Sequence, residues 1–215
     1  MSGSITRESL LDSLDAEISW RRVEFAALRS TLTRTKGPAQ ETAARTAVAL
    51  AYAHWEGYVV TASRSLLRYV IGLRLKYGQL SDVYLALCLA GSLVQAEASV
   101  RRIRRHIDVV VLLRGSDDRA IFPSPERSIQ AEGNLKSEKF DDIVMRLGLN
   151  AEPFELHYKW LDTELLRRRN GIAHGAIGYT DAEFGQSALE TVNDLLTRFR
   201  TAAQNAAALE VYRRQ

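Results

Sequence analysis

The segment from residue 167 to residue 175 contains the side chains best suited to chemistry on a phosphate. Arg169 keeps its charge at any working pH and offers a planar fork of donors that fits a phosphate group. Asn170 adds an amide, and His174 can exchange a proton near neutral pH. Together these residue types suggest cleavage of an RNA phosphodiester. Arg169 would clamp the phosphate, His174 would act as base or acid, and Asn170 would orient the substrate or the imidazole.

The spacing of these residues places a condition on the local backbone. On an unbroken helix, the five positions from Arg169 to His174 turn the two side chains about 140° apart. Asn170 and Gly171 form a turn-prone pair, so we expect the helix to end near Asn170 and the chain to fold back, which would bring His174 beside Arg169. The structural alternative is that Arg169 is a solvated last-turn cation and Asn170–Gly171 a helix cap.

RNA itself supplies much of what such a reaction needs. Its 2′-hydroxyl is a nucleophile already tethered to the scissile phosphorus, so no metal-bound water is required. One histidine cannot easily act on both sides of an in-line displacement. A two-fold dimer would solve this, because an isologous interface places equivalent residues close together near the axis. We therefore expect a homodimer in which two copies of His174 share one cleft.

Further candidates surround this segment. Tyr52 and Glu56 lie four residues apart and share one helix face. A carboxylate in a helix core is unusual unless it is paired, so Glu56 either orients Arg169 or His174 or forms a buried salt bridge with an arginine. Arg168 is a third supporting candidate. His54, on an alanine-rich face, is more typical of a core histidine.

Charge is a weaker guide than these motifs. The formal net charge is +3 and the sequence pI about 9.1, a modest excess that does not indicate a dedicated nucleic-acid coat protein. Placement matters more, and the candidate RNA-binding residues are Arg101, Arg102, Arg105 and Arg167. The alternative for each cluster is a solvated helix face paired with nearby carboxylates.

Three stretches resemble the HEPN superfamily, in particular a bacterial subgroup found beside defence and toxin genes. Residues 162–175 read DTELLRRRNGIAHG and resemble the ribonuclease signature, in which an Arg and a polar residue are followed a few positions later by His. Residues 52–58 read YAHWEGY and resemble the second-helix signature. Residues 134–140, NLKSEKF, followed by LGL at 147–149, resemble the segment before the catalytic helix. The similarity spans about residues 10–212.

This resemblance implies a HEPN-type helical fold and a metal-independent endoribonuclease that acts as a toxin or defence effector. It also implies a composite site built from two domains, with products ending in a 2′,3′-cyclic phosphate and a 5′-hydroxyl. The partner that the resemblance implies is an antitoxin or a regulatory or sensor protein. Two alternatives stay open: a non-catalytic helical module that binds RNA or protein, and a toxin controlled by covalent modification, for which Tyr179 is a candidate position.

The elements that must position these residues are helical almost throughout. Near the N-terminus, apolar residues recur at steps of three, four and seven and so form one stripe along a helix: Leu10, Leu14, Ile18, Phe25, Leu28 and Leu32. Helices are expected over residues 6–33, 38–76, 81–89 or beyond, 100–113, 137–147, 151–169 and 181–204, the last with an extension to 212. Residues 107–113 are rich in β-branched residues and could form a strand, but helix is favoured.

The expected architecture is a single domain over residues 1–215, an all-α up-and-down bundle of HEPN type. A polar connection at about 114–136 is the best candidate for an inserted loop. One cysteine and four histidines nowhere show the paired spacing of a zinc site, and no cofactor is expected. The N-terminus lacks the apolar core of a secretory signal and no apolar run approaches ~20 residues, so a soluble cytoplasmic protein is predicted.

Overall fold

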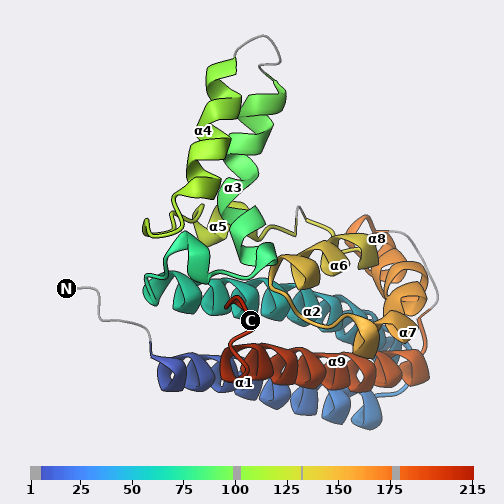
Figure 1. Ribbon diagram of the computed structural model, residues 1–215. Helices are drawn as coiled ribbons and strands as arrows, with labels where there is room; N and C mark the ends of the chain where they lie inside the picture. The colour runs from blue at the N-terminus through green and yellow to red at the C-terminus, as the bar shows by residue number, and fades with distance from the viewer. Residues whose placement is uncertain (1–5, 99–102, 132, 176–179) are drawn as a thin grey trace.

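Three long helices form the base layer of the computed structural model (Figure 1), which describes residues 6–98, 103–131, 133–175 and 180–215. They are α1 (Arg7–Arg34), α2 (Pro38–Gly72) and α9 (Ala182–Ala208). The predicted stripe of α1 is confirmed, because five of its six residues are buried and Leu28 packs partly buried against the core. Pro38 occupies the first turn of α2, where its missing N–H costs nothing.

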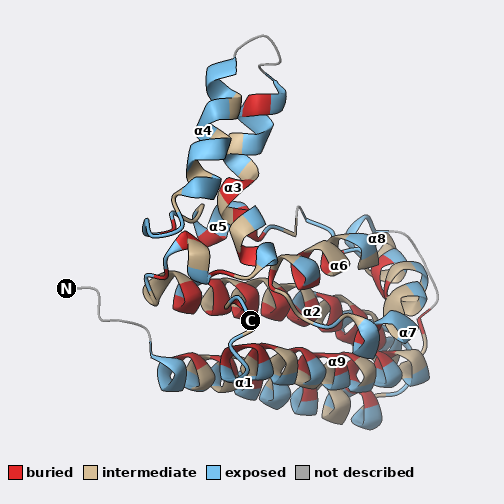
Figure 2. Cartoon of the chain, viewed as in Figure 1, coloured by how far each residue is buried: buried red, intermediate tan, exposed pale blue. Residues whose placement is uncertain are grey.

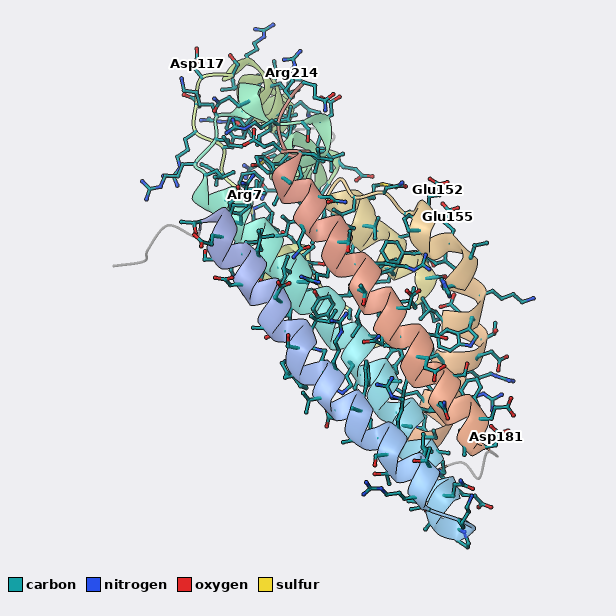
Figure 3. All side chains as sticks on the ribbon, turned by 90° about the horizontal axis from the view of Figure 1, so that it is seen from below. Arg7, Asp117, Glu152, Glu155, Asp181 and Arg214 are labelled. Atoms are coloured by element: carbon teal, nitrogen blue, oxygen red, sulfur yellow. The ribbon has the colours of Figure 1, made fainter. Side chains whose placement is uncertain are left out.

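The base layer is held by both apolar and polar contacts. Helices α1 and α9 run side by side in opposite directions, with Arg7 and Asp181 at opposite ends of the layer (Figure 3). Arg22 of α1 donates to Thr197 of α9 over 2.9 Å, and Arg200 of α9 pairs with Asp15 of α1. Asp181 caps α9 by accepting from the N–H of Phe184 at 2.7 Å. These contacts fix the start of α9 just after the candidate motif.

An aromatic cluster attaches the second layer to this base. Phe140 of α6 (Ser137–Arg146) lies 4.9 Å from the Trp55 ring of α2 and 5.0 Å from Phe154 of α7 (Glu152–Trp160), centroid to centroid. Phe199 of α9 packs on Phe140 and Phe154 at 5.9 and 6.2 Å. All four rings are fully buried. Edge-to-face and tilted packing of this kind adds to the free energy gained by burial, so α6 and α7 are firmly seated over α2 and α9.

One continuous helical segment carries the candidate motif. It begins as α7, widens into a π-helical stretch, η2 (Leu161–Leu166), and continues as α8 (Arg167–Ala173). Leu161, Leu165 and Leu166 of the wide turn are buried. Asp162 is half-buried and accepts from the backbone N–H and the hydroxyl of Ser137, at 2.9 and 2.5 Å. The wide turn thereby caps the start of α6.

The part of the chain that leaves the bundle is a helical hairpin. Helices α3 (Asp82–Glu97) and α4 (Ile103–Arg114) project from the side of the base layer on which α6 and α8 also lie (Figure 1). The predicted helix over 107–113 is confirmed, and Gly91 does not interrupt α3. Figure 2 shows that most of this hairpin is exposed, and α4 has no buried residue. We call this hairpin the arm.

The polar connection after the arm packs back on the bundle at several points. It contains the short helix α5 (Pro125–Ser128), and the side chains of Ile129 and Leu135 are buried. The guanidinium of Arg64 on α2 donates twice to the Ile129 carbonyl, at 3.1 and 2.8 Å. A short 3₁₀ turn, η1 (Tyr77–Gln79), precedes α3. The described residues are predominantly helical with no strand beyond isolated bridges, which confirms the all-α HEPN-type class.

Candidate functional site

Helix α8 does not end where the sequence suggested. The backbone N–H of His174 donates to the carbonyl of Asn170 at 3.0 Å, so the helix runs through Asn170 and Gly171. Gly175 takes the left-handed conformation, with φ 71°, and ends the helix instead. The predicted turn at Asn170–Gly171 is therefore wrong. Ile172 packs against the core, and this contact favours one more helical turn.

This correction changes the relation between the two reactive side chains. On a continuing helix, Arg169 and His174 point about 140° apart. Within the described residues no hydrogen bond or ring contact joins them, and the expectation that the chain folds back to bring them together is not met. His174 is exposed at the end of α8. One chain therefore holds the cation and the imidazole on different sides of one helix end.

The guanidinium of Arg169 is held by three polar contacts and one ring. Its Nη1 donates to the side-chain oxygens of Asn170 at 2.7 Å and Asn134 at 3.3 Å, and its Nη2 donates to the Gly133 carbonyl at 3.2 Å. Its central carbon lies 4.3 Å from the centroid of the Tyr52 ring. Within the described residues, Nε–H and one N–H of Nη2 have no partner. These donors form the edge with which an arginine grips a phosphate.

Tyr52 is in turn anchored by Glu56 and by the backbone of Leu135. The Tyr52 hydroxyl donates to Glu56 at 2.7 Å, and the Leu135 N–H donates to both the Tyr52 oxygen at 2.5 Å and Glu56 at 3.1 Å. Burial, reinforced by the hydrogen bond to Glu56, raises the pKa of Tyr52, so its hydroxyl stays protonated. Within the described residues, Glu56 forms no hydrogen bond or ion pair with Arg169 or His174. It fixes the ring under Arg169 and the segment beside it.

Two hollows flank this arrangement and meet at Lys136. One, of about 610 Å³, is lined by Lys136, Arg167, Asn170 and residues of the wide turn, including Asp162 and Glu164. The other, of about 460 Å³, is lined by Asn134, Lys136, Lys139 and neighbouring residues of α6. Several lining carboxylates are already engaged: Glu164 pairs with Arg168, and Asp162 caps α6. Lys136 and Arg167 line the hollows beside further carboxylates, Glu138 and Asp142, of which Asp142 pairs with Arg146 at 2.7 Å.

The other arginines that the sequence indicated lie at different positions in the fold and have different partners. Arg168 stacks on Phe184 at 4.1 Å and pairs with Glu164 at 3.1 Å, which ties α8 to the start of α9. Arg167 is exposed, and its Nε donates to the Thr163 carbonyl at 2.9 Å. Arg105 lies on the arm, where it pairs with Asp108 at 3.7 Å, and the structure does not bring it to Arg169. Arg101 and Arg102 lie outside the described residues.

His54 occupies a different environment from His174. Its ring contacts Trp20 and Phe25 edge-on, with centroids 5.2 and 4.9 Å apart, and its Nε2 lies 2.7 Å from Glu24. Burial lowers the pKa of His54, and Glu24 only partly offsets this. The residue faces α1, which agrees with the interpretation as a core histidine. Tyr179, the candidate modification position, lies outside the described residues.

The sequence indicated Asn170 and Tyr52, but it assigned no role to Asn134 and Gly133, the other two residues that hold Arg169. Asn134 and Gly133 lie 35 and 36 residues away in the chain, and the Leu135 contact is made by its backbone. Lys136, at the meeting point of the two hollows, was also missed. The only available signal was the similarity of residues 134–140 to the segment before the catalytic helix of HEPN ribonucleases.

The fold and the position of this motif define a helical-bundle protein of HEPN type. The HEPN family described as HEPN_MAE_28990-like HEPN matches residues 10–212. The chain therefore belongs to the HEPN family. No curated protein matches it, and neither does any solved structure. At the level of the family, membership suggests a ribonuclease, toxin or defence type of function.

Two further findings concern the described residues only. No group of three or more His, Cys, Asp or Glu side chains gathers there in a way that could hold a metal ion. Every helix is too short or too polar to cross a lipid bilayer.

Proposed function

We propose that this protein is an endoribonuclease that acts as a toxin or defence effector and cleaves RNA by attack of the 2′-hydroxyl, without a metal ion. The reacting groups are Arg169, Asn170 and His174, contributed by two copies of the chain to one site. The observation that carries the proposal is the fixed guanidinium of Arg169, stacked on Tyr52 with one bidentate edge open, beside hollows bordered by Lys136 and Arg167.

Preorganisation of Arg169 supports a role in the transition state rather than in general RNA attraction. A cation that is already oriented needs no reorganisation when negative charge builds up on the phosphorus oxygens. Asn134, Asn170 and Gly133 occupy the far end of the guanidinium and leave the Nε side for the substrate. Asn170 thus positions Arg169, in addition to the substrate contact that its amide could make.

The positions of Arg169 and His174 at the end of α8 support a site that is built from two copies of the chain. Because α8 continues to Ala173, Arg169 and His174 of one chain leave the helix about 140° apart, and one chain supplies a single imidazole for a reaction that needs both a base and an acid. A two-fold axis near the end of α8 brings the exposed His174 of each copy into one cleft. The proposal therefore requires a dimer for chemistry, because the second His174 must come from the second copy.

The reaction balances with these groups. One His174 takes the proton of the 2′-hydroxyl while the 2′-oxygen forms a bond to phosphorus. The bond from phosphorus to the 5′-oxygen breaks, and the His174 of the second copy donates a proton to the departing oxygen. Arg169 stabilises the additional negative charge on the phosphate. The products are a 2′,3′-cyclic phosphate and a 5′-hydroxyl.

The direct test is incubation of the purified protein with total RNA in the presence of a chelator. We expect cleavage with 2′,3′-cyclic phosphate ends, and its loss in His174→Ala and Arg169→Ala variants that retain their helical content. Cleavage that persists in purified, dimeric His174→Ala protein refutes the assignment. RNA binding without cleavage by the wild-type protein would favour the non-catalytic RNA-binding alternative.

A further inference from the structure

The arm exposes two apolar stripes, one on each helix. On α4 the side chains of Ile103, Ile107 and Val110 are 71%, 51% and 44% exposed and recur at steps of four and three. On α3 the exposed or half-exposed residues Val83, Ala86, Ala90 and Leu93 recur at steps of three and four. This spacing is the one with which helices pack along a shared seam. Apolar surface of this extent on a projecting element indicates a contact surface.

The two stripes differ in size, and the difference is complementary. The stripe of α4 consists of bulky β-branched residues. The stripe of α3 contains two alanines, and together with Met145 of α6 it borders a hollow of about 450 Å³. Bulky side chains on one helix can enter a hollow over small side chains on another, which is how helices pack closely.

The charges on the two helices are complementary as well. Helix α3 carries Asp82 and Glu97, one at each end, and no lysine or arginine. Helix α4 carries Arg104, Arg105 and Arg114 against a single aspartate. Asp82, Glu97, Arg104 and Arg114 are all exposed, and within the described residues none of them has an ion-pair partner. Although α3 and α4 contact each other within the hairpin, these four charged groups form no ion pair within its described part, and they stay available to a second copy.

We propose that the arm is a self-association surface, in which α4 of one copy packs on the α3 face of a second copy and the contact is repeated by two-fold symmetry. The complement that α4 needs, an acidic helix whose apolar stripe includes two alanines over a hollow, is present on α3 of the same chain. An isologous arrangement uses both contacts and covers both stripes. Because α3 is acidic at both ends and α4 is basic at both ends, the charges match in either relative direction of the helices.

RNA is a weaker candidate for this surface. A phosphate backbone would neutralise the arginines of α4, but it would leave Ile103, Ile107 and Val110 in water and meet only carboxylates on α3. The arm arginines, including Arg105, are therefore assigned to association between copies rather than to the RNA site. This inference does not depend on RNA cleavage, since it concerns a surface away from Arg169.

Charge exchange provides a test that only contact between copies can satisfy. One variant, acidic in α4, carries Arg104→Glu and Arg114→Glu. The other, basic in α3, carries Asp82→Lys and Glu97→Lys. In each variant alone, like charges face each other across the contact, and we expect the association constant to fall at least about tenfold. Mixing the two variants pairs acidic α4 with basic α3, and wild-type α4 with wild-type α3, so association should return.

The readout is the mass of the full chain by sedimentation or light scattering, with circular dichroism as a check of folding. Ile107→Glu with Val110→Glu should remove the same step of association. Leu156→Glu, which changes a 93% exposed residue of α7 away from the arm, should leave the mass unchanged. A monomeric wild-type protein, or variants that keep the wild-type mass, would overturn the proposal. The proposal would also be overturned if the variant with Arg104→Glu and Arg114→Glu bound RNA more weakly but kept the wild-type mass.

Discussion

The guanidinium carbon of Arg169 lies 4.3 Å from the centroid of the Tyr52 ring, and that ring is itself fixed by Glu56. An arginine stacked on an aromatic face keeps its plane and direction, because both the cation–π attraction and the hydrogen bonds at its far end restrict it. The site is thus arranged from α2 outward: Glu56 fixes Tyr52 and Leu135, Tyr52 stacks on Arg169, and Gly133 and Asn134, just before Leu135, accept from its guanidinium.

Arg169→Lys tests whether the planar fork is needed or only the charge. Lysine keeps the positive charge but cannot contact Asn134, Asn170 and Gly133 while also gripping a phosphate at two points. We expect single-turnover RNA cleavage to fall by about 100-fold or more. The free energy of unfolding should change by less than about 1 kcal/mol, since the side chain is only half-buried. Cleavage close to the wild-type rate would contradict the role.

Glu56→Ala tests the support beneath the arginine. The change removes an acceptor from the Leu135 N–H and the partner of the Tyr52 hydroxyl, and we expect unfolding to become easier by about 1–3 kcal/mol. Cleavage should fall while RNA affinity changes little, because the phosphate-gripping edge remains but is less well oriented. Glu56→Gln keeps an oxygen acceptor for Leu135 and is the matched control. A loss as large in the glutamine variant would point to the charge of Glu56 instead.

Subunit mixing tests the composite site. If both copies of His174 act in one cleft, a dimer of one wild-type and one His174→Ala chain is inactive. Adding an equal amount of the variant under conditions of subunit exchange should then reduce total cleavage to about half, because random pairing leaves about a quarter of dimers fully wild-type. Independent sites would leave the total unchanged. Heterodimer formation can be checked by differently tagged chains.

The burial of His54 predicts a pH dependence of stability. Because burial lowers the pKa of His54 in the native state below its ordinary value of about 6.5, the unfolded chain takes up a proton first as the pH falls. The free energy of unfolding should therefore decrease as the pH drops below about 6.5, and this loss stops once the native state is protonated too. Denaturant titrations between about pH 7 and pH 5 would measure it. His54→Gln should flatten the slope, and an equally steep slope in that variant would assign the effect to other groups.

The helices could be predicted from the sequence because their signals are local. The stripe from Leu10 to Leu32 and Pro38 at the start of α2 depend only on spacing and on one residue's chemistry. The end of α8 shows the limit of such signals. Two glycines, Gly171 and Gly175, each could end the helix, and the packing of Ile172 against the core selects the second.

The candidate site was predicted only in part, because its contacts connect distant parts of the chain. The motif itself indicated Arg169, and the helical spacing placed Tyr52 and Glu56 on one face. Two contacts depend on how residues 133–136 cross α2 and α8. One is the hydrogen bond from Arg169 to Asn134, and the other is the donation of the Leu135 N–H to both Tyr52 and Glu56. No local pattern contains this information.

The wide turn at Leu161–Leu166 determines in which direction the motif points. Relative to an ordinary α-helix, a π-helical turn accommodates an extra residue, and each residue corresponds to about 100° of rotation. A deletion of one residue here would leave every residue of the motif unchanged, but it would rotate Arg169 away from the Tyr52 ring. A related chain could therefore keep the Arg, Asn and His of this motif and yet present them in another direction around the helix. When such proteins are sorted into active and inactive forms, the rotation of this helix should be compared as well as its sequence.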